Sequence, residues 1–160
     1  MKMKEVINLL DGGKKSDPVL GDVFVMHMKG IGFIPGMVVK DDMKYGSERL
    51  YLIYIYNEIS EDKNIGFRLV KENMIVPPAL VTKMDWRANG GFEIIGNTQK
   101  AGMDVFKNHC FYDDLRMRYI DQNKEVCEKF DPCGIYAISN IGSEAISIYE
   151  KLNPGIEIVE

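Results

Sequence analysis

Three cysteines and two histidines are the residues of this chain best suited to nucleophilic or metal chemistry: Cys110, Cys127, Cys133, His27 and His109. A Cys–His pair acts as nucleophile and base only when the two side chains come within hydrogen-bond reach, usually from positions distant in the sequence. His109 and Cys110 are neighbours and would point to opposite faces of a strand. A small hydrolase that uses Cys110 and His27 is therefore one alternative. The other is that the thiols pack as small apolar groups while the imidazole lies along a strand.

No metal, cofactor or catalytic motif is expected. Five residues separate Cys127 from Cys133, and structural zinc sites use four ligands with shorter cysteine spacings. The acidic pair Asp113-Asp114 lies among arginines, which is typical of a solvated, charge-balanced face. Asn89-Gly90-Gly91 lacks the Lys-Ser/Thr and helix of a phosphate-binding loop. We therefore expect a protein that is not an enzyme.

Composition favours a single globular domain of 160 residues with a net charge of −4. Nucleic acid is a poor partner for it, because nucleic-acid binders need clustered Lys and Arg, and the longest basic stretch is Lys14-Lys15. An acidic protein is instead steered toward a basic partner. No apolar run is long enough for a membrane span or a secretory signal. The odd, sparse cysteine count indicates reduced thiols and a cytoplasmic protein.

The first half of the chain predicts an antiparallel meander of three strands. Residues 22–28, 31–40 and 49–57 are rich in β-branched and aromatic side chains. In the third strand both faces are apolar, with Leu50, Leu52, Tyr54 and Tyr56 on one side, so it should be central and covered on both sides. Pro35 and the flanking glycines in the second strand predict a bent strand of the kind that closes a small barrel.

The remaining elements are shorter. Residues 79–84 and 92–95 read as two strands joined by the turn formers of 85–91, whereas 67–75 is ambiguous between helix and strand. Residues 116–120 and 124–130 flank a turn and read as a second hairpin, with a charged helix as the alternative. Ile141 to Leu152 follow the spacing of an amphipathic helix that Asn140 or Ser143 can cap. A short N-terminal helix is expected over residues 4–10.

These elements predict a mostly β (α+β) fold. We expect an SH3-like, strongly bent antiparallel sheet or partial barrel with a C-terminal helix. Residues 1–160 would form one domain, with a β core at 17–97 and an extension at 98–160 that contains the hairpin and the helix.

Acidic residues flank the central strand at both ends and are candidates for partner binding, although in a meander they need not share a face. Trp86 is a further candidate, because Trp is enriched among energetic hot spots of interfaces. The alternatives are a solvated acidic rim and a Trp86 that packs back onto the sheet. The candidate residues are Asp41, Asp42, Glu48, Glu58, Glu61, Asp62 and Trp86.

The order of several motifs resembles the immunity protein 26 family of bacterial polymorphic toxin systems. These motifs are Gly21-Asp22-Val23-Phe24, Gly32 and Gly36, the strand Leu50 to Tyr56, Ile75-Val76-Pro77-Pro78, Trp86, and Gly91-Phe92-Glu93-Ile94-Ile95-Gly96. The similarity covers mainly Asp17 to about Asn97. Met26-His27-Met28 departs from the plainer apolar strand expected there, and the segment before Asp17 has no clear counterpart.

The resemblance implies an immunity protein that neutralises a cognate toxin by stoichiometric binding, and it carries over no fixed binding residues. If the toxin is a nuclease, its basic groove would complement an acidic immunity surface. A second reading is a non-enzymatic adaptor that binds a peptide in the groove of an SH3-like barrel. Such a groove needs exposed aromatic side chains at Tyr51, Tyr54, Tyr56 and Trp86.

Overall fold

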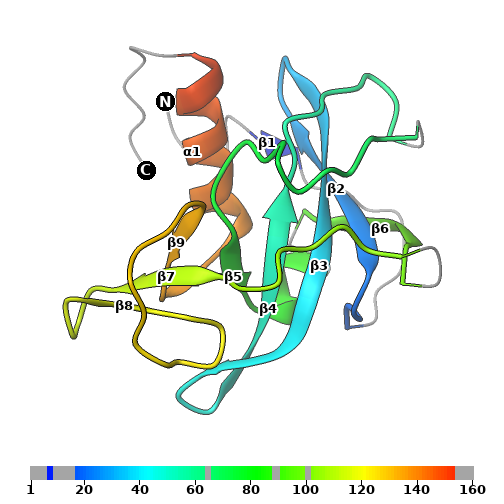
Figure 1. Ribbon diagram of the computed structural model, residues 1–160. Helices are drawn as coiled ribbons and strands as arrows, with labels where there is room; N and C mark the ends of the chain where they lie inside the picture. The colour runs from blue at the N-terminus through cyan, green and yellow to red at the C-terminus, as the bar shows by residue number, and fades with distance from the viewer. Residues whose placement is uncertain (1–6, 9–16, 64–65, 88–90, 100–101, 154–160) are drawn as a thin grey trace.

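The computed structural model describes residues 7–8, 17–63, 66–87, 91–99 and 102–153, and it shows a mostly β protein with one α-helix (Figure 1). The larger sheet has the strand order β1-β2-β3-β4-β5-β10, and β6 also pairs with β2; the smaller sheet has the order β8-β7-β9. The larger sheet comprises β1 (Ile7–Asn8), β2 (Asp22–Met28), β3 (Gly32–Tyr45), β4 (Glu48–Ile55), β5 (Ala79–Val81), β6 (Glu93–Asn97) and β10 (Ile138–Ser139). The smaller sheet comprises β7 (Cys110–Asp113), β8 (Arg118–Ile120) and β9 (Cys133–Ile135).

Strand β4 is central and buried on both faces, as the sequence predicts. It pairs with β3 on one side and β5 on the other. Tyr51, Ile53 and Ile55 join the cluster that contains the buried face of α1 (Ile141–Leu152). Leu50, Leu52, Tyr54 and Tyr56 join a second cluster, which includes Phe111 and Ile120 of the smaller sheet. The helix and the smaller sheet therefore cover opposite faces of the same strand.

The predicted meander of β2, β3 and β4 is confirmed, and so are the short strands β5 and β6. Pro35 lies in β3, which has a strand on either side. The regular pairing of β3 with β4 ends at Ile55, and the Pro35 carbonyl accepts from the N–H of the next residue, Tyr56. The missing proline donor thus falls at the end of the ladder. Two register shifts farther along β3, between Val38 and Met43, are bulges that bend this strand.

The expected SH3-like bent sheet or partial barrel is not confirmed, because the described strands form two sheets that are not closed into a barrel. The larger sheet ends at β10, which pairs only with β5 and does so in parallel. β9 also pairs in parallel, with β7, so the fold is not purely antiparallel. The smaller sheet lies over one face of the larger sheet, so the extension covers the β core without closing it.

Three further expectations require correction or restriction. Strand β8 pairs with β7 around residues 114–117. The predicted hairpin around residues 121–123 is present in part, because Ile120 bridges Val126 and the N–H groups of Cys127 and Asp121 donate to the carbonyl oxygens of Tyr119 and Glu125, but residues 124–130 form no regular strand. Residues 67–75 form neither helix nor strand apart from a bridge at Met74. Ile7–Asn8, within the predicted N-terminal helix, forms β1 and pairs with β2; the rest of that expectation lies outside the described residues. Among the described residues, no helix is long and apolar enough to cross a membrane.

An aromatic cluster explains the glycine at position 36. Phe24 on β2 packs against Trp86 and Phe92, with ring centroids 5.3 Å and 4.4 Å away. The same Phe24 ring lies over Gly36, where an added Cβ would come within 2.4 Å of it and within 2.7 Å of the Tyr54 carbonyl oxygen. Gly36 therefore serves the packing of Phe24, in addition to any freedom it gives the backbone.

Helix α1 begins where the sequence predicts and is capped twice. The Asn140 side chain accepts from the Ser143 N–H at 2.9 Å. Asp85, from the 3₁₀-helix η2 (Lys83–Trp86), accepts from the Ile141 N–H at 3.2 Å. Burial raises the pKa of Asp85 to about 6, the hydrogen bond from Ile141 opposes this shift, and the charge of Glu144 adds to it. Asp85 thus links the start of α1 to η2. This link places a carboxyl group in the core, where burial disfavours its charged form.

The first prediction concerns Gly36→Ala. The added methyl group has to displace Phe24 or the backbone, so we expect the free energy of unfolding to fall by about 1–3 kcal/mol, the usual cost of overpacking. Gly96→Ala is the matched control, because nothing lies within 4 Å of its added Cβ; its effect should stay within about 0.5 kcal/mol. Urea denaturation measures both, and equal effects would contradict the packing argument.

The second prediction concerns the pH dependence of stability. Asp85 in the folded protein has a pKa of about 6, against an ordinary value of 3.8, so this group stabilises the fold at acid pH and loses that effect as pH rises through 6. As pH falls from about 7 to about 4, wild type should therefore gain on the order of 2 kcal/mol relative to Asp85→Asn. Asp114→Asn, at an exposed carboxylate, should show no such trend. A pH-independent difference for Asp85→Asn would refute this assignment.

Candidate partner-binding surfaces

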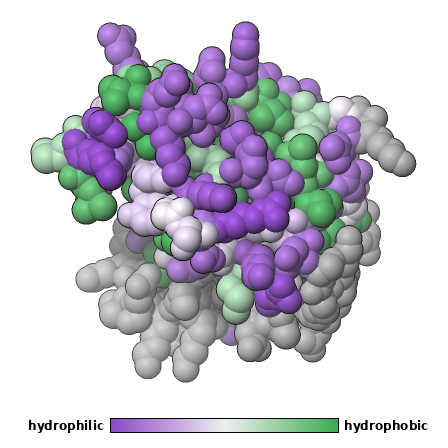
Figure 2. All heavy atoms as spheres, turned by 90° about the horizontal axis from the view of Figure 1, so that it is seen from below, coloured by the Kyte–Doolittle hydropathy of each residue, from purple (hydrophilic) through white to green (hydrophobic). Residues whose placement is uncertain are grey.

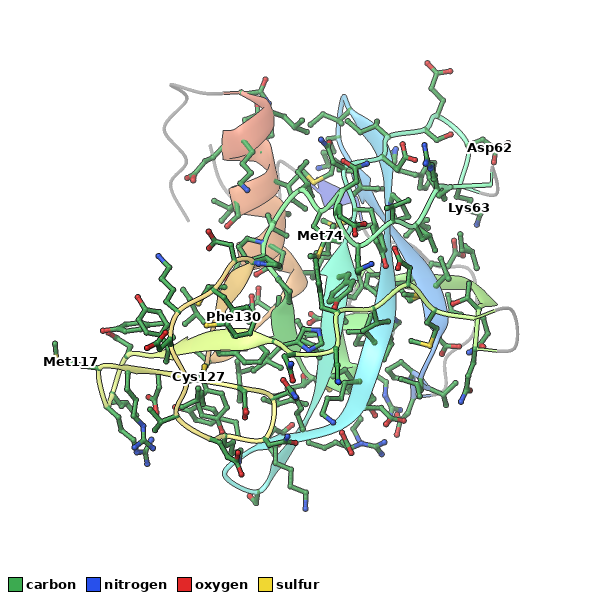
Figure 3. All side chains as sticks on the ribbon, in the orientation of Figure 1. Asp62, Lys63, Met74, Met117, Cys127 and Phe130 are labelled. Carbon is green, nitrogen blue, oxygen red and sulfur yellow. The ribbon has the colours of Figure 1, made fainter. Side chains whose placement is uncertain are left out.

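The six acidic candidates form two separate groups. Asp41 and Asp42 lie in the bulged part of β3 and Glu48 begins β4, so these three surround the β3–β4 turn. Glu58, Glu61 and Asp62 follow the other end of β4. Figure 3 places Asp62 at the top right, far from the β3–β4 turn at the bottom. The structure therefore does not bring the six residues together on one surface.

Neighbouring cations balance much of the acidic charge at the β3–β4 turn. Lys40 Nζ lies 2.9 Å from Asp42, and Arg49 Nη2 lies 3.7 Å from Asp41. The hydrogen bond from Lys40 is the largest cause of the lowered pKa of Asp42. The carboxylate of Glu48 has no ion pair or hydrogen bond with any described residue. The turn is thus a mixed-charge surface.

The second acidic group contains three acidic residues and no Lys or Arg between residues 58 and 62. Glu58 accepts from the Arg68 backbone N–H at 3.2 Å, and Asp62 donates its own N–H to Ser60 Oγ at 3.1 Å. The adjacent Lys63 is committed to buried Glu93, with Nζ 2.8 Å from Oε2. The carboxylate of Glu61 has no partner among the described residues. Residues 58–62 therefore form the more acidic of the two groups.

Trp86 packs back onto the sheet and lies in the core, which was the alternative to partner binding. It is therefore not exposed for contact with a partner. Its side chain is 2% exposed and lies between the rings of Phe24, Tyr51 and Phe92. Tyr51, Tyr54 and Tyr56 are buried as well. These four residues consequently do not form the exposed aromatic groove that the adaptor reading requires.

The three thiols gather within and beside the smaller sheet. Cys110 is buried and pairs in register with Cys133, and all three cysteines are free. Burial, with a smaller contribution from the neighbouring Cys110 thiol, raises the pKa of Cys133 to about 12. Burial and Cys110 also raise the pKa of Cys127. His27 stacks on Phe33 in the larger sheet, with ring centroids 4.4 Å apart. Proximity among these thiols was not foreseen from their spacing, and the raised pKa values disfavour the reactive thiolate.

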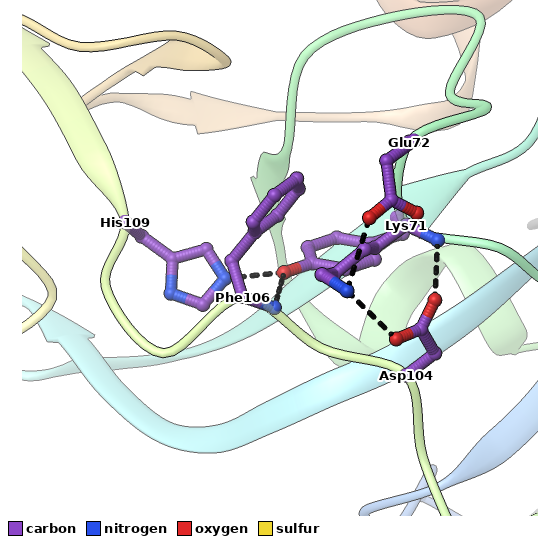
Figure 4. Close-up of polar contacts among 6 residues, drawn as sticks. Lys71, Glu72, Asp104, Phe106 and His109 are labelled. Carbon is purple, nitrogen blue, oxygen red and sulfur yellow. Dashed lines mark hydrogen bonds and ion pairs between the residues drawn. The ribbon is translucent and has the colours of Figure 1, made fainter.

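Buried and surface polar contacts join the β core to the extension (Figure 4). Tyr54 on β4 shares a hydrogen bond of 2.5 Å with His109 Nε2 and accepts from the Phe106 N–H at 3.1 Å. Burial raises the pKa of Tyr54 to about 12 and lowers that of His109 to about 4, so both are uncharged at neutral pH. Nearby, Asp104 accepts from the backbone N–H and the side chain of Lys71. These contacts connect residues of the β core to residues of the extension.

Exposed apolar side chains concentrate on the smaller sheet and the segments beside it. Leu115, Met117, Val126, Phe130, Ile135 and Ile138 are all exposed there. The signal in the sequence is the run Leu115-Arg116-Met117-Arg118, in which apolar and cationic residues alternate. Residues 116–120 were predicted to form a strand, but residues 114–117 form the β7–β8 turn and the strand begins only at Arg118. A turn exposes both kinds of side chain together.

Comparison with known proteins identifies the family. The model of immunity protein 26 matches residues 19–111, which is more than half of the chain. This chain belongs to the immunity protein 26 family. The match confirms the resemblance drawn from the motifs of residues 17–97 and extends it into β7. No curated protein and no solved structure gives a match.

The third prediction compares two tyrosines on the same face of the sheet. Tyr54→Phe removes the hydroxyl that contacts both His109 and the Phe106 N–H. Leaving such buried groups unpaired should cost about 1–3 kcal/mol of unfolding free energy. The buried hydroxyl of Tyr56 has no hydrogen-bond partner among the described residues. Tyr56→Phe should therefore be neutral or stabilising. Chemical denaturation tests the pair, and the reverse order of stabilities would disprove the role given to Tyr54.

Proposed function

We propose that this immunity protein neutralises a cognate toxin of a bacterial polymorphic toxin system by binding it directly and stoichiometrically in the cytoplasm. The single observation that carries the proposal is the family match over residues 19–111. Immunity proteins have a toxin protein as their partner, so the open question is how this chain inactivates it. Direct binding either occludes the active site of the toxin or blocks another surface that the toxin needs.

The chemistry of the buried groups supports binding over catalysis. The imidazole of His109 is enclosed and uncharged at neutral pH, where a general base needs access to a substrate proton. Cys127 and Cys133 have raised pKa values, so their nucleophilic thiolate forms are disfavoured. A protein with a rigid core and these inert buried groups acts on a toxin through its surface.

We assign the acidic contact first to residues 58–62 and second to the β3–β4 turn. Residues 58–62 contain three acidic residues and no Lys or Arg, whereas Lys40 and Arg49 pair with carboxylates at the turn. A toxin with a basic groove, such as a nuclease, is the partner that suits this charge. In this proposal Trp86 does not contact the toxin. It packs in the hydrophobic core and so stabilises the fold that carries both acidic groups. The whole chain acts as one domain in this proposal, because one apolar cluster includes residues of both the β core and the extension.

The fourth prediction is that the protein encoded beside this chain co-purifies with it and binds it more weakly as salt increases, because salt screens the contact between opposite charges. Isothermal titration calorimetry at low and high salt measures the change in Kd. Failure of the neighbouring toxin to co-purify would contradict the proposed function.

Two charge reversals then locate the acidic contact. Glu61→Lys and Glu48→Lys are matched, because each removes an exposed carboxylate that lacks a partner among the described residues. Reversal at the contact should raise Kd about tenfold, and reversal at the other group should have little effect. If both variants bind as well as wild type, the acidic contact is wrong although direct binding remains.

A further inference from the structure

A cleft of about 420 Å³ opens between the β3–β4 turn and the β7–β8 turn. We call it the cationic cleft; the residues that matter for its chemistry are Tyr45, Leu115, Arg116, Arg118, Lys124 and Tyr136. Tyr45 and Tyr136 pack together with ring centroids 5.1 Å apart. The Tyr136 hydroxyl donates to the Lys44 carbonyl oxygen at 3.0 Å, which holds this wall against β3. These contacts therefore hold in place the wall that Tyr45 and Tyr136 form.

The cleft has an excess of positive charge in a protein of net charge −4. Its one carboxylate, Asp113, is buried and accepts from both the Nη1 and the backbone N–H of Arg116, at 3.1 Å and 3.3 Å. Lys124 Nζ lies 5.8 Å from the centre of the Tyr136 ring. The guanidinium of Arg118 makes no ion pair or hydrogen bond with any described residue. Arg118 and Lys124 are thus left without a carboxylate partner in the described part of the chain.

Apolar side chains stand beside these cations. Leu115 is 80% exposed and Met117 is 79% exposed, and both belong to the β7–β8 turn. Met117 has a φ of 53°, a left-handed conformation that is unfavourable for a residue with a side chain. Figure 2 views the molecule from below and shows hydrophobic and strongly hydrophilic groups together at its left edge, where this turn projects. Arginine, methionine and tyrosine are enriched in protein interfaces relative to the rest of a protein surface.

Most of the cationic cleft lies outside the segment that the family shares. The family match ends at residue 111, whereas all three cations and Leu115 come from residues 115–124. Only the wall at Tyr45 and Gly46 lies within the match. The cleft therefore combines a hairpin inside the family match with a segment outside it, and its charged wall comes from the segment outside the match.

We propose that the cationic cleft receives an acidic segment of the toxin and so determines which toxin this protein recognises. A carboxylate of that segment pairs with Arg118, whose planar guanidinium can bind both oxygens, and Lys124 adds a second positive charge. An apolar side chain next to the carboxylate packs on Leu115 and Met117. This assignment rests on the proposed function for the identity of the partner, but the chemistry of the cleft can be tested without the toxin.

The first experiment, and the fifth prediction, uses a short acidic peptide that contains leucine, titrated into ¹⁵N-labelled protein. We expect saturable shifts of the amide signals of Leu115, Arg118 and Lys124. Arg118→Glu should abolish these shifts, and the same peptide with lysines in place of its acids should restore them. Lys107→Glu is the control, because it makes the same change of charge at another exposed cation. Shifts that are absent, or that Arg118→Glu leaves unchanged, would overturn the assignment of the cleft.

The second experiment uses the toxin encoded beside this chain. Arg118→Glu should raise Kd at least about tenfold, circular dichroism should show that this variant is folded, and Lys107→Glu should bind as wild type does. If wild type binds and Arg118→Glu binds equally well, the cleft is not the recognition site, although the proposed function stands. If wild type does not bind, the proposed function fails, and the peptide titration still decides whether the cleft accepts an acidic segment.

Discussion

The burial of β4 on both faces is the constraint on which the rest of this structure depends. A strand with apolar side chains on both sides must be covered on both sides, and a single sheet cannot do this. Helix α1 and the aromatic cluster around Trp86 cover one face, and the smaller sheet covers the other. The extension after residue 97 is therefore part of the core, because without it Leu52, Tyr54 and Tyr56 would be exposed to water.

This arrangement leaves recognition to the turns and ends of strands. The buried polar groups are used to join segments: Tyr54 and His109 join the β core to the extension, and Asp85 joins η2 to the start of α1. What remains at the surface is an acidic group at residues 58–62 and the cationic cleft beside the β3–β4 turn. We propose that these two charged surfaces, which are opposite in sign, contact the toxin.

Residues whose environment is set by local periodicity could be predicted from the sequence. The alternation in Leu50 to Tyr56 gave the two faces of β4, and the spacing from Ile141 to Leu152 gave α1 with its Asn140 cap. Distant contacts could not be predicted. Whether the sheet closes depends on where the extension packs, and the acidic residues separate because β4 lies between them. Leu115-Arg116-Met117-Arg118 was visible as a pattern, but only the turn at 114–117 brings it beside Tyr45.

The central claim is that this protein acts by occupying a toxin and not by altering it. Titration of toxin activity against increasing amounts of this protein tests the claim most directly. Stoichiometric binding predicts that activity falls linearly to zero at a fixed molar ratio, does not change with longer incubation, and returns when the complex is separated under denaturing conditions and the toxin is refolded. Progressive, irreversible loss of toxin activity at a small molar fraction of this protein would contradict the claim.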